Sequence, residues 1–152
     1  MAYDDAGPFP AGKDRRSSFP APPPEAPRRP AAIAGAVAAG VAAGVLGTAL
    51  HGHLLFVGGV AVPVGALAAL LLAGSLFLLC GLWARNVMMT ALAGAIAYGI
   101  VALLSRSSKT LILTGSSTAA PGTALAGNLW LFGVLIATLA AVVRGVVVLR
   151  QR

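Results

Sequence analysis

Only a few side chains in this chain could carry out chemistry, and most of them stand alone. The candidate metal ligands are His51 and His53, which are two residues apart. On a helix, positions i and i+2 point to different faces, and no Cys, Asp or Glu follows nearby to complete a tetrahedral zinc site. The single cysteine, Cys80, lies among leucines and a glycine and is expected to pack as a small apolar group. We therefore predict no metal site and no cofactor.

The positions of the acidic side chains exclude most catalytic mechanisms. All four lie near the N-terminus, at Asp4, Asp5, Asp14 and Glu25. The rest of the chain has no carboxylate for paired-carboxylate hydrolysis, and none to orient a histidine beside a nucleophilic serine. No glycine-rich phosphate loop follows a strand, because the glycines stand inside apolar segments. We predict no catalytic residues, so the chain on its own is not expected to be an enzyme.

The composition places the chain in a membrane. Of the 152 residues, 58% are apolar and only 10% are charged, whereas a soluble domain has about 45–50% apolar and about 25% charged residues. Such a chain cannot cover itself with a hydrated surface. The net charge of +7 could suggest a nucleic-acid partner, but the arrangement of the charges along the chain argues against one. The predicted partner is the lipid bilayer, with another membrane protein or a second copy of the chain as further possibilities.

Four apolar segments are long enough to cross a bilayer, which takes about 20 helical residues. They occupy residues 31–53, 61–83, 87–104 and 124–145. Helix breakers, among them Gly58 and Gly59, separate the first two segments, and Pro63 stands near the start of the second. The short link Arg85-Asn86 separates the second segment from the third. The predicted fold class is therefore all-α, an integral membrane four-helix bundle whose membrane domain covers residues 31–149.

Two further segments are predicted to lie in water. Residues 1–30 hold eight of the ten prolines and show no periodic apolar pattern, so they are expected to form a disordered, Pro-rich tail. Residues 105–123 are rich in Ser, Thr and Gly and are expected to form a solvated extracytoplasmic loop.

The distribution of Lys and Arg predicts the orientation. Most of these residues flank the spans on the side of the two termini, and only Arg106 and Lys109 lie on the other side. Because segments rich in Lys and Arg stay in the cytoplasm, we predict a multi-pass protein of the cell (inner) membrane with both termini cytoplasmic. Four arginines are predicted to bind anionic lipid headgroups: Arg28, Arg29, Arg85 and Arg144.

Small residues recur at helical spacing within the spans. Ala36, Gly40, Gly44 and Thr48 are four residues apart and share one helix face. Small residues at this spacing let two membrane helices approach closely. Similar faces occur in the third span, at Ala91, Ala95 and Gly99, and in the fourth, at Gly133, Ala137, Ala141 and Gly145. We predict that these faces pack within the bundle, and a dimerisation face is the alternative.

Three features of residues 31–145, taken together, resemble those of a known group of proteins. They are the Ala- and Gly-rich spans, the link Arg85-Asn86, and an outer loop that opens with Ser105-Arg106 and leads through Leu111–Gly115 to the helix around Gly127–Gly133. This layout resembles that of small, uncharacterised four-helix membrane proteins of high-GC Gram-positive bacteria. The resemblance implies a location and a fold without a reaction.

The function expected from the sequence is that of a structural or accessory partner of a membrane complex. The alternative is a small transporter or pore that is active as an oligomer. A transport path needs polar side chains along it. The hydroxyl side chains available inside the spans for that purpose are Thr48, Thr90, Tyr98 and Thr138. The transporter hypothesis therefore requires these four side chains to face a common cavity.

Overall fold

The computed structural model describes residues 25–106, 112, 115 and 120–151. Its elements are α1 (Arg29–Leu50), β1 (Leu55–Val57), β2 (Val60–Val62), α2 (Val64–Trp83), α3 (Val87–Ser105) and α4 (Pro121–Arg150). Most of the predicted tail, and most of the predicted loop over residues 105–123, lie outside the described residues.

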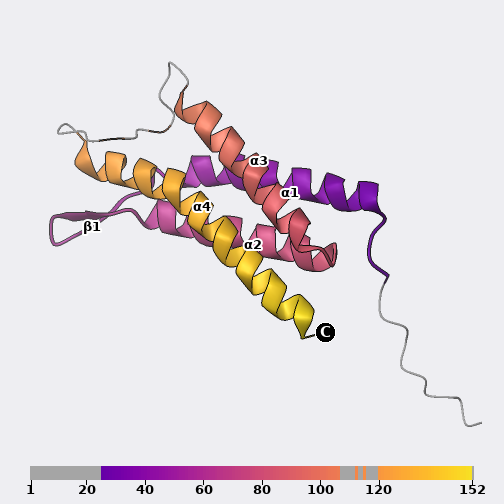
Figure 1. Ribbon diagram of the computed structural model, residues 1–152. Coiled ribbons are helices and arrows are strands. Elements are labelled where there is room, and N and C mark those ends of the chain that lie inside the picture. The colour runs from indigo at the N-terminus through magenta and orange to yellow at the C-terminus, as the bar shows by residue number, and fades with distance from the viewer. Residues whose placement is uncertain (1–24, 107–111, 113–114, 116–119, 152) are drawn as a thin grey trace, which may run out of the picture.

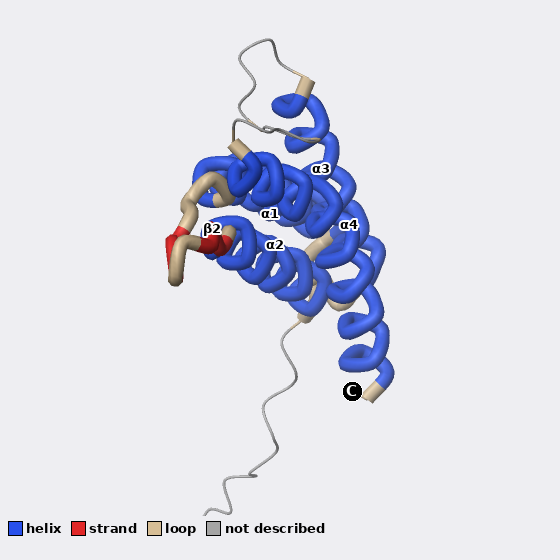
Figure 2. Tube along the Cα trace, turned by 90° about the vertical axis from the view of Figure 1, so that its left-hand side faces the viewer, coloured by secondary structure: helices blue, strands red, loops and turns tan. Residues whose placement is uncertain are grey.

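The four helices pack side by side as a bundle. α1 lies against α2 and α3, and α4 packs on α2 and α3 as well (Figures 1 and 2). The start of α1, the α2–α3 turn and the end of α4 lie at one end of the bundle, and the β-hairpin lies at the other (Figure 1). We call them the terminal end (residues 25–29, 84–86 and 145–151) and the hairpin end (residues 51–63, 106 and 120–121). The predicted fold class, an all-helical four-helix bundle, is confirmed.

Each helix is long and apolar enough to cross a membrane. The outward faces carry large apolar side chains such as Leu71 of α2, which is 75% exposed, and others on all four helices, including Val45, Met88, Leu103 and Ile136. Continuous apolar surface of this kind is not compatible with water around the bundle. These faces therefore contact lipid.

The interior of the bundle consists mainly of small residues. Eight alanines of the described residues are fully buried: Ala36, Ala43, Ala66, Ala69, Ala73, Ala93, Ala97 and Ala126. Only a few large side chains, chiefly Phe77 and Trp130, fill the remaining space. Because lipid offers no hydrophobic drive for helix association, close backbone approach over small residues supplies the dispersion energy that holds such a bundle together.

The connection between the first two spans is a β-hairpin, where the sequence predicted only a turn. β1 and β2 are antiparallel, with Leu55 opposite Val62 and Val57 opposite Val60. The two residues between them, Gly58 and Gly59, have φ values of 58° and 83°. A two-residue type I′ turn requires positive φ at both positions, which glycine adopts without a Cβ clash. The hairpin takes residues from both spans, so the first helix ends at Leu50 and the second starts at Val64.

The α2–α3 turn is a tight, hydrogen-bonded cap. The backbone N–H of Asn86 donates to the Gly81 carbonyl at 3.0 Å, and that of Arg85 donates to Leu82 at 3.2 Å, the bond pair of a Schellman motif. The Asn86 side chain accepts from the Met88 N–H at 2.9 Å and caps α3. Arg85 sits in the left-handed position, with φ of 50°, which usually holds glycine.

Replacing Arg85 with glycine is expected to stabilise the protein. The substitution removes the Cβ that crowds a left-handed backbone, a gain of about 1 kcal/mol in the free energy of unfolding. The measurement is the thermal midpoint in detergent. Arg28→Gly is the control, because Arg28 is also an exposed cation at the terminal end but has φ of −57°. A midpoint for Arg85→Gly at or below that of the control would contradict the prediction.

Candidate functional site

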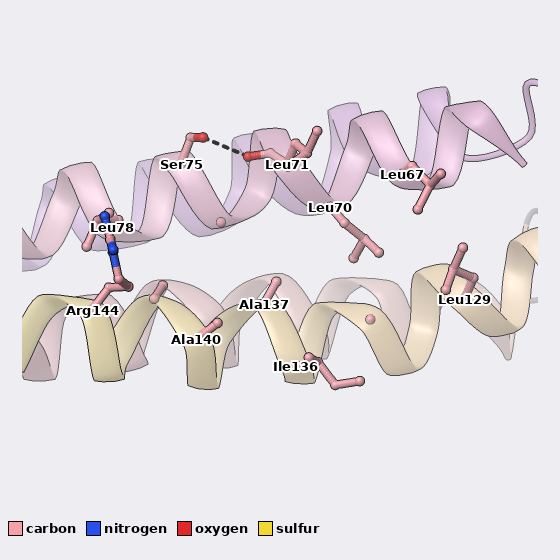
Figure 3. A pocket seen from close by; sticks show the side chains of 13 residues that line it. Leu67, Leu70, Leu71, Ser75, Leu78, Leu129, Ile136, Ala137, Ala140 and Arg144 are labelled. Carbon is pink, nitrogen blue, oxygen red and sulfur yellow. Dashed lines mark hydrogen bonds between the residues drawn. The ribbon is translucent and has the colours of Figure 1, made fainter.

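A long groove lies between α2 and α4. It encloses about 720 Å³ and opens toward the lipid. Leucines, Ile136 and small residues such as Ala137 line it (Figure 3), and Gly74 lies opposite Ala137; we call the small lining residues the floor of the groove and the larger ones its rims. Ser75 is polar, but its hydroxyl donates to the Leu71 carbonyl at 2.7 Å. Arg144 is the one charged residue that lines the groove.

Two smaller grooves lie elsewhere on the bundle. One, of about 540 Å³, is at the terminal end, where Pro27, Arg29 and Asn86 contribute to its lining. The other, of about 310 Å³, is between α1 and α2 and is lined by Gly35, Cys80 and other apolar residues. Neither groove has a pair of acid–base side chains among its lining residues.

The two histidines take different positions. His51 is buried, and its Nδ1 lies 2.6 Å from the Thr48 carbonyl. Since a carbonyl only accepts, this ring nitrogen carries the proton. His53 is exposed. Among the described residues, no three His, Cys, Asp or Glu side chains gather where they could hold a metal ion.

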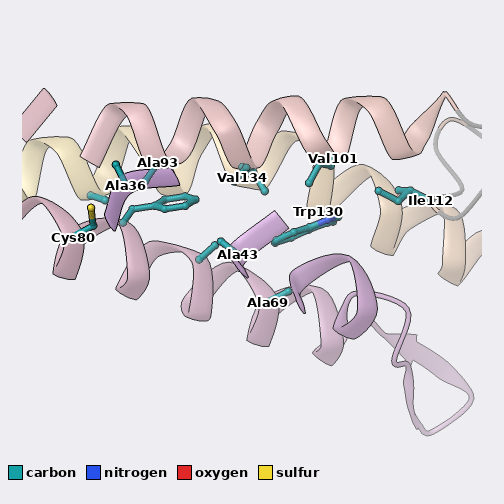
Figure 4. Packing of buried hydrophobic residues seen from close by; sticks show 13 residues of the cluster. Ala36, Ala43, Ala69, Cys80, Ala93, Val101, Ile112, Trp130 and Val134 are labelled. Carbon is teal, nitrogen blue, oxygen red and sulfur yellow. The ribbon is translucent and has the colours of Figure 1, made fainter. Parts of the chain in front are cut away.

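A buried tryptophan joins α4 to α1 at the hairpin-end half of the bundle. Trp130 is fully buried (Figure 4), and its Nε1 donates to the Thr48 hydroxyl at 3.3 Å. Its ring lies directly against Gly47, where a side chain would overlap it. Trp130 therefore packs inside the bundle. Trp83, in contrast, is 51% exposed at the end of α2.

The small-residue face of α1 meets α3. A Cβ placed on Gly40 would lie 2.6 Å from the Ala93 carbonyl oxygen, and one on Gly44 would lie 3.3 Å from that of Ala97. Ala36 is buried on the same face, and Thr48 ends it with the bond from Trp130. The structure thus brings all four of these α1 residues to helix contacts.

The predicted face of α3 is placed differently. Ala95 and Gly99 are exposed, and nothing lies within 4 Å of a Cβ placed on Gly99. The side of α3 that packs in the bundle contains Thr90, Ala93, Gly94, Ala97 and Val101. Because α3 carries small residues on two neighbouring faces, spacing alone did not identify the inward one. On α4, Gly133 packs against Leu70, and Ala141 and Gly145 are buried.

None of the three grooves described above brings the hydroxyl side chains together. Thr138 donates to the Val134 carbonyl at 2.7 Å and packs against Gly94. Thr90 is fully buried against Gly81, and its hydroxyl has no hydrogen-bond partner. Neither residue lines any of the three grooves, and neither do Thr48 and Tyr98.

Thr90→Val is expected to raise the free energy of unfolding by about 1 kcal/mol, because it removes a buried hydroxyl that has no partner while keeping the side-chain shape. Thr138→Val is the control, since it removes a hydroxyl that is bonded. Chemical unfolding in detergent measures both. If Thr90→Val were destabilising by as much as the control, the Thr90 hydroxyl would have to make a stabilising contact.

The four arginines predicted to bind headgroups all lie toward the terminal end and are exposed. Arg28 and Arg29 are at the start of α1, and Arg85 is in the α2–α3 turn. Arg144 is set further into the bundle, a little less than two turns before α4 ends at Arg150.

Part of the segment after α3 is attached to the bundle, which the sequence did not indicate. The Gly115 N–H donates to Asn128 Oδ1 at 2.8 Å, and Asn128 Nδ2 donates back to the Gly115 carbonyl at 2.9 Å. Ile112 is buried in the core cluster. The available signals were an asparagine within the apolar fourth span and an isoleucine within a polar loop.

Comparisons with known proteins identify no relatives: no family model matches the chain, and neither do curated proteins or solved structures. The four packed helices carry the assignment instead. The chain is a multi-pass membrane protein. Its helices are consistent with a small four-helix membrane protein, as the resemblance implied, but they point to no particular family.

Proposed function

We propose that the protein is a non-enzymatic structural or accessory partner of a membrane complex. The observation that carries the proposal is the dense interior. Small residues bring the helices into contact, and the hydroxyls of Thr48 and Thr138 are used in hydrogen bonds within the bundle. A bundle packed in this way can bind other molecules only through its outward faces.

The exposed small residues of α3 support a role in contacts with another helix. Ala95 and Gly99 face outward at helical spacing, and the surface at Gly99 is open. A partner helix could approach the α3 backbone closely at this position.

Site-specific photo-cross-linking in native membranes, followed by mass spectrometry, tests this proposal. A photoreactive residue at Gly99 is expected to capture one defined membrane protein. The same residue at Ala97, which is fully buried two positions away, serves as the control and is expected to capture nothing outside the chain. Capture at Gly99 of lipid alone would argue against an accessory role. Capture of further copies of the chain alone would favour the transporter alternative.

The transporter or pore alternative has less support. It requires a common polar path, whereas Thr48 and Thr138 bond within the bundle, and Thr90 packs against Gly81. Transport by an oligomer would need these side chains to leave those contacts.

We also propose that the terminal end faces the cytoplasm. Support comes from the described arginines: Arg28, Arg29, Arg85, Arg144 and Arg150 lie toward the terminal end, whereas Arg106 lies at the hairpin end. A reporter fused after residue 152 that is active only in the cytoplasm is expected to be active. Activity of a periplasm-specific reporter at the same position would reverse the orientation.

A further inference from the structure

The α2–α4 groove has the length and lining of a slot for a lipid acyl chain. It extends from Leu67 near the hairpin end to Leu78 near the terminal end (Figure 3). At about 1.5 Å per helical residue this distance is about 16 Å, roughly half of the ~30 Å hydrocarbon thickness of a bilayer. The groove lies along the middle of α2 and is about as long as the hydrocarbon of one leaflet is thick, so it has room for one acyl chain that enters from the terminal end.

The floor of the groove leaves space beside the backbone. At Gly74 an added Cβ would meet only the Ala137 Cβ, at 4.0 Å. With short side chains on the floor and leucines on the rims, the groove can take up an extended hydrocarbon chain by van der Waals contact along its length.

Arg144 places a positive charge at the terminal-end mouth of this apolar slot. Its side chain extends from α4 toward Leu78 of α2 (Figure 3). Leu78 precedes the end of α2 at Trp83 by little more than one turn, so the guanidinium lies close enough to the headgroup region to reach it by snorkelling. A cation at this depth is stabilised by an anion beside it.

The chain does not supply that anion among its described residues. Their single carboxylate belongs to Glu25, which precedes α1, and Arg144 makes no hydrogen bond or ion pair with another described residue. A helix from a second copy of the chain could fill the apolar slot, but its spans contain no acidic side chain. An anionic lipid satisfies both parts of the site, because it joins an acyl chain to a phosphate.

We propose that the α2–α4 groove is a binding site for one anionic diacyl phospholipid of the terminal-end leaflet. One acyl chain lies along Gly74 and Ala137, and the phosphate pairs with the Arg144 guanidinium. This site is separate from the outward face of α3 and does not depend on the proposed accessory function.

Native mass spectrometry of the full chain in detergent tests the proposal, with phosphatidylglycerol and phosphatidylcholine of identical acyl chains as probes. The wild-type chain is expected to retain one phosphatidylglycerol in preference to phosphatidylcholine. Arg144→Gln is expected to weaken phosphatidylglycerol retention about fivefold, the factor that corresponds to about 1 kcal/mol for one cation at an anionic headgroup. Arg150→Gln, a cation on the same helix outside the groove, is the matched control and should retain the lipid like the wild type.

A second pair of variants tests the slot itself. At Gly74 an added Cβ meets only the Ala137 Cβ, at 4.0 Å, so Gly74→Leu is expected to fill the floor and to abolish retention of the lipid. Leu139→Phe is the control, because Leu139 is 66% exposed on α4 and does not line the groove. Circular dichroism and the thermal midpoint verify that each variant folds, and Ala140→Leu replaces Gly74→Leu if the latter does not.

Three results would overturn the proposal. The first is equal retention of the two lipids by the wild-type chain. The second is undiminished phosphatidylglycerol retention by Arg144→Gln or by the folded groove-filling variant. The third is a dimer without bound lipid that Gly74→Leu dissociates, because the groove would then hold a helix of a second copy.

Discussion

Trp130→Ala is expected to lower the free energy of unfolding by about 3 kcal/mol, the lower end of the range for a buried aromatic residue. Trp130 is fully buried, contacts Gly47 across the bundle and donates its indole N–H to Thr48. Its removal leaves a cavity between α1 and α4 that small neighbours cannot fill. We expect the lower end of this range because the protein is surrounded by apolar lipid. The substitution therefore costs packing contacts but does not expose apolar surface to water.

The measurement is unfolding of the purified chain in detergent, followed by circular dichroism. Trp83→Ala is the control, since Trp83 is a residue of the same type that is 51% exposed. It is expected to lose less than half as much stability, because most of its ring contacts can be replaced by detergent. Equal losses for the two variants would show that Trp130 is not at the centre of the packing.

Gly40→Ile is the second substitution with a large expected effect, also about 3 kcal/mol, at the upper end of the range for overpacking. A Cβ at Gly40 would lie 2.6 Å from the Ala93 carbonyl oxygen and 2.8 Å from the Ile96 Cβ. The first of these atoms is backbone and cannot rotate away. The substitution can be accommodated only if α1 and α3 move apart, which loses the close contact along both helices.

Gly99→Ile provides the matched control for this prediction. It makes the same change in a helix of the same bundle, but nothing lies within 4 Å of a Cβ at that position. Its midpoint in detergent should equal or exceed that of the wild type, because glycine is a poor helix former. A Gly40→Ile midpoint as high as that of Gly99→Ile would refute the close α1–α3 contact.

Some of the site could be anticipated from local sequence. The spacing of Ala36, Gly40 and Gly44 identified one small face of α1, and the structure places these residues in helix contacts. The same rule applied to α3 selected Ala95 and Gly99, which face outward. In α3 both neighbouring faces carry small residues, so local spacing does not distinguish them.

Local sequence patterns could predict neither the hairpin nor the α2–α4 groove, and the reasons differ. Gly58-Gly59 is a strong turn signal, but it lies within an unbroken apolar run, where strand and helix cannot be separated by hydropathy alone. The groove is formed by residues of α2 and α4 that lie more than fifty positions apart, such as Gly74 and Ala137.

The amino-acid sequence alone determined that the helices lie in a lipid bilayer and that there are four of them. A bilayer accepts only segments of about 20 apolar residues that satisfy their own backbone hydrogen bonds, and the composition of each span met that condition without reference to the others. The tertiary structure decided which helix faces meet, where Trp130 is buried and where Arg144 stands at the mouth of a groove. In a chain of alanine, glycine and leucine these faces are chemically alike, so their choice depends on shape complementarity between distant segments.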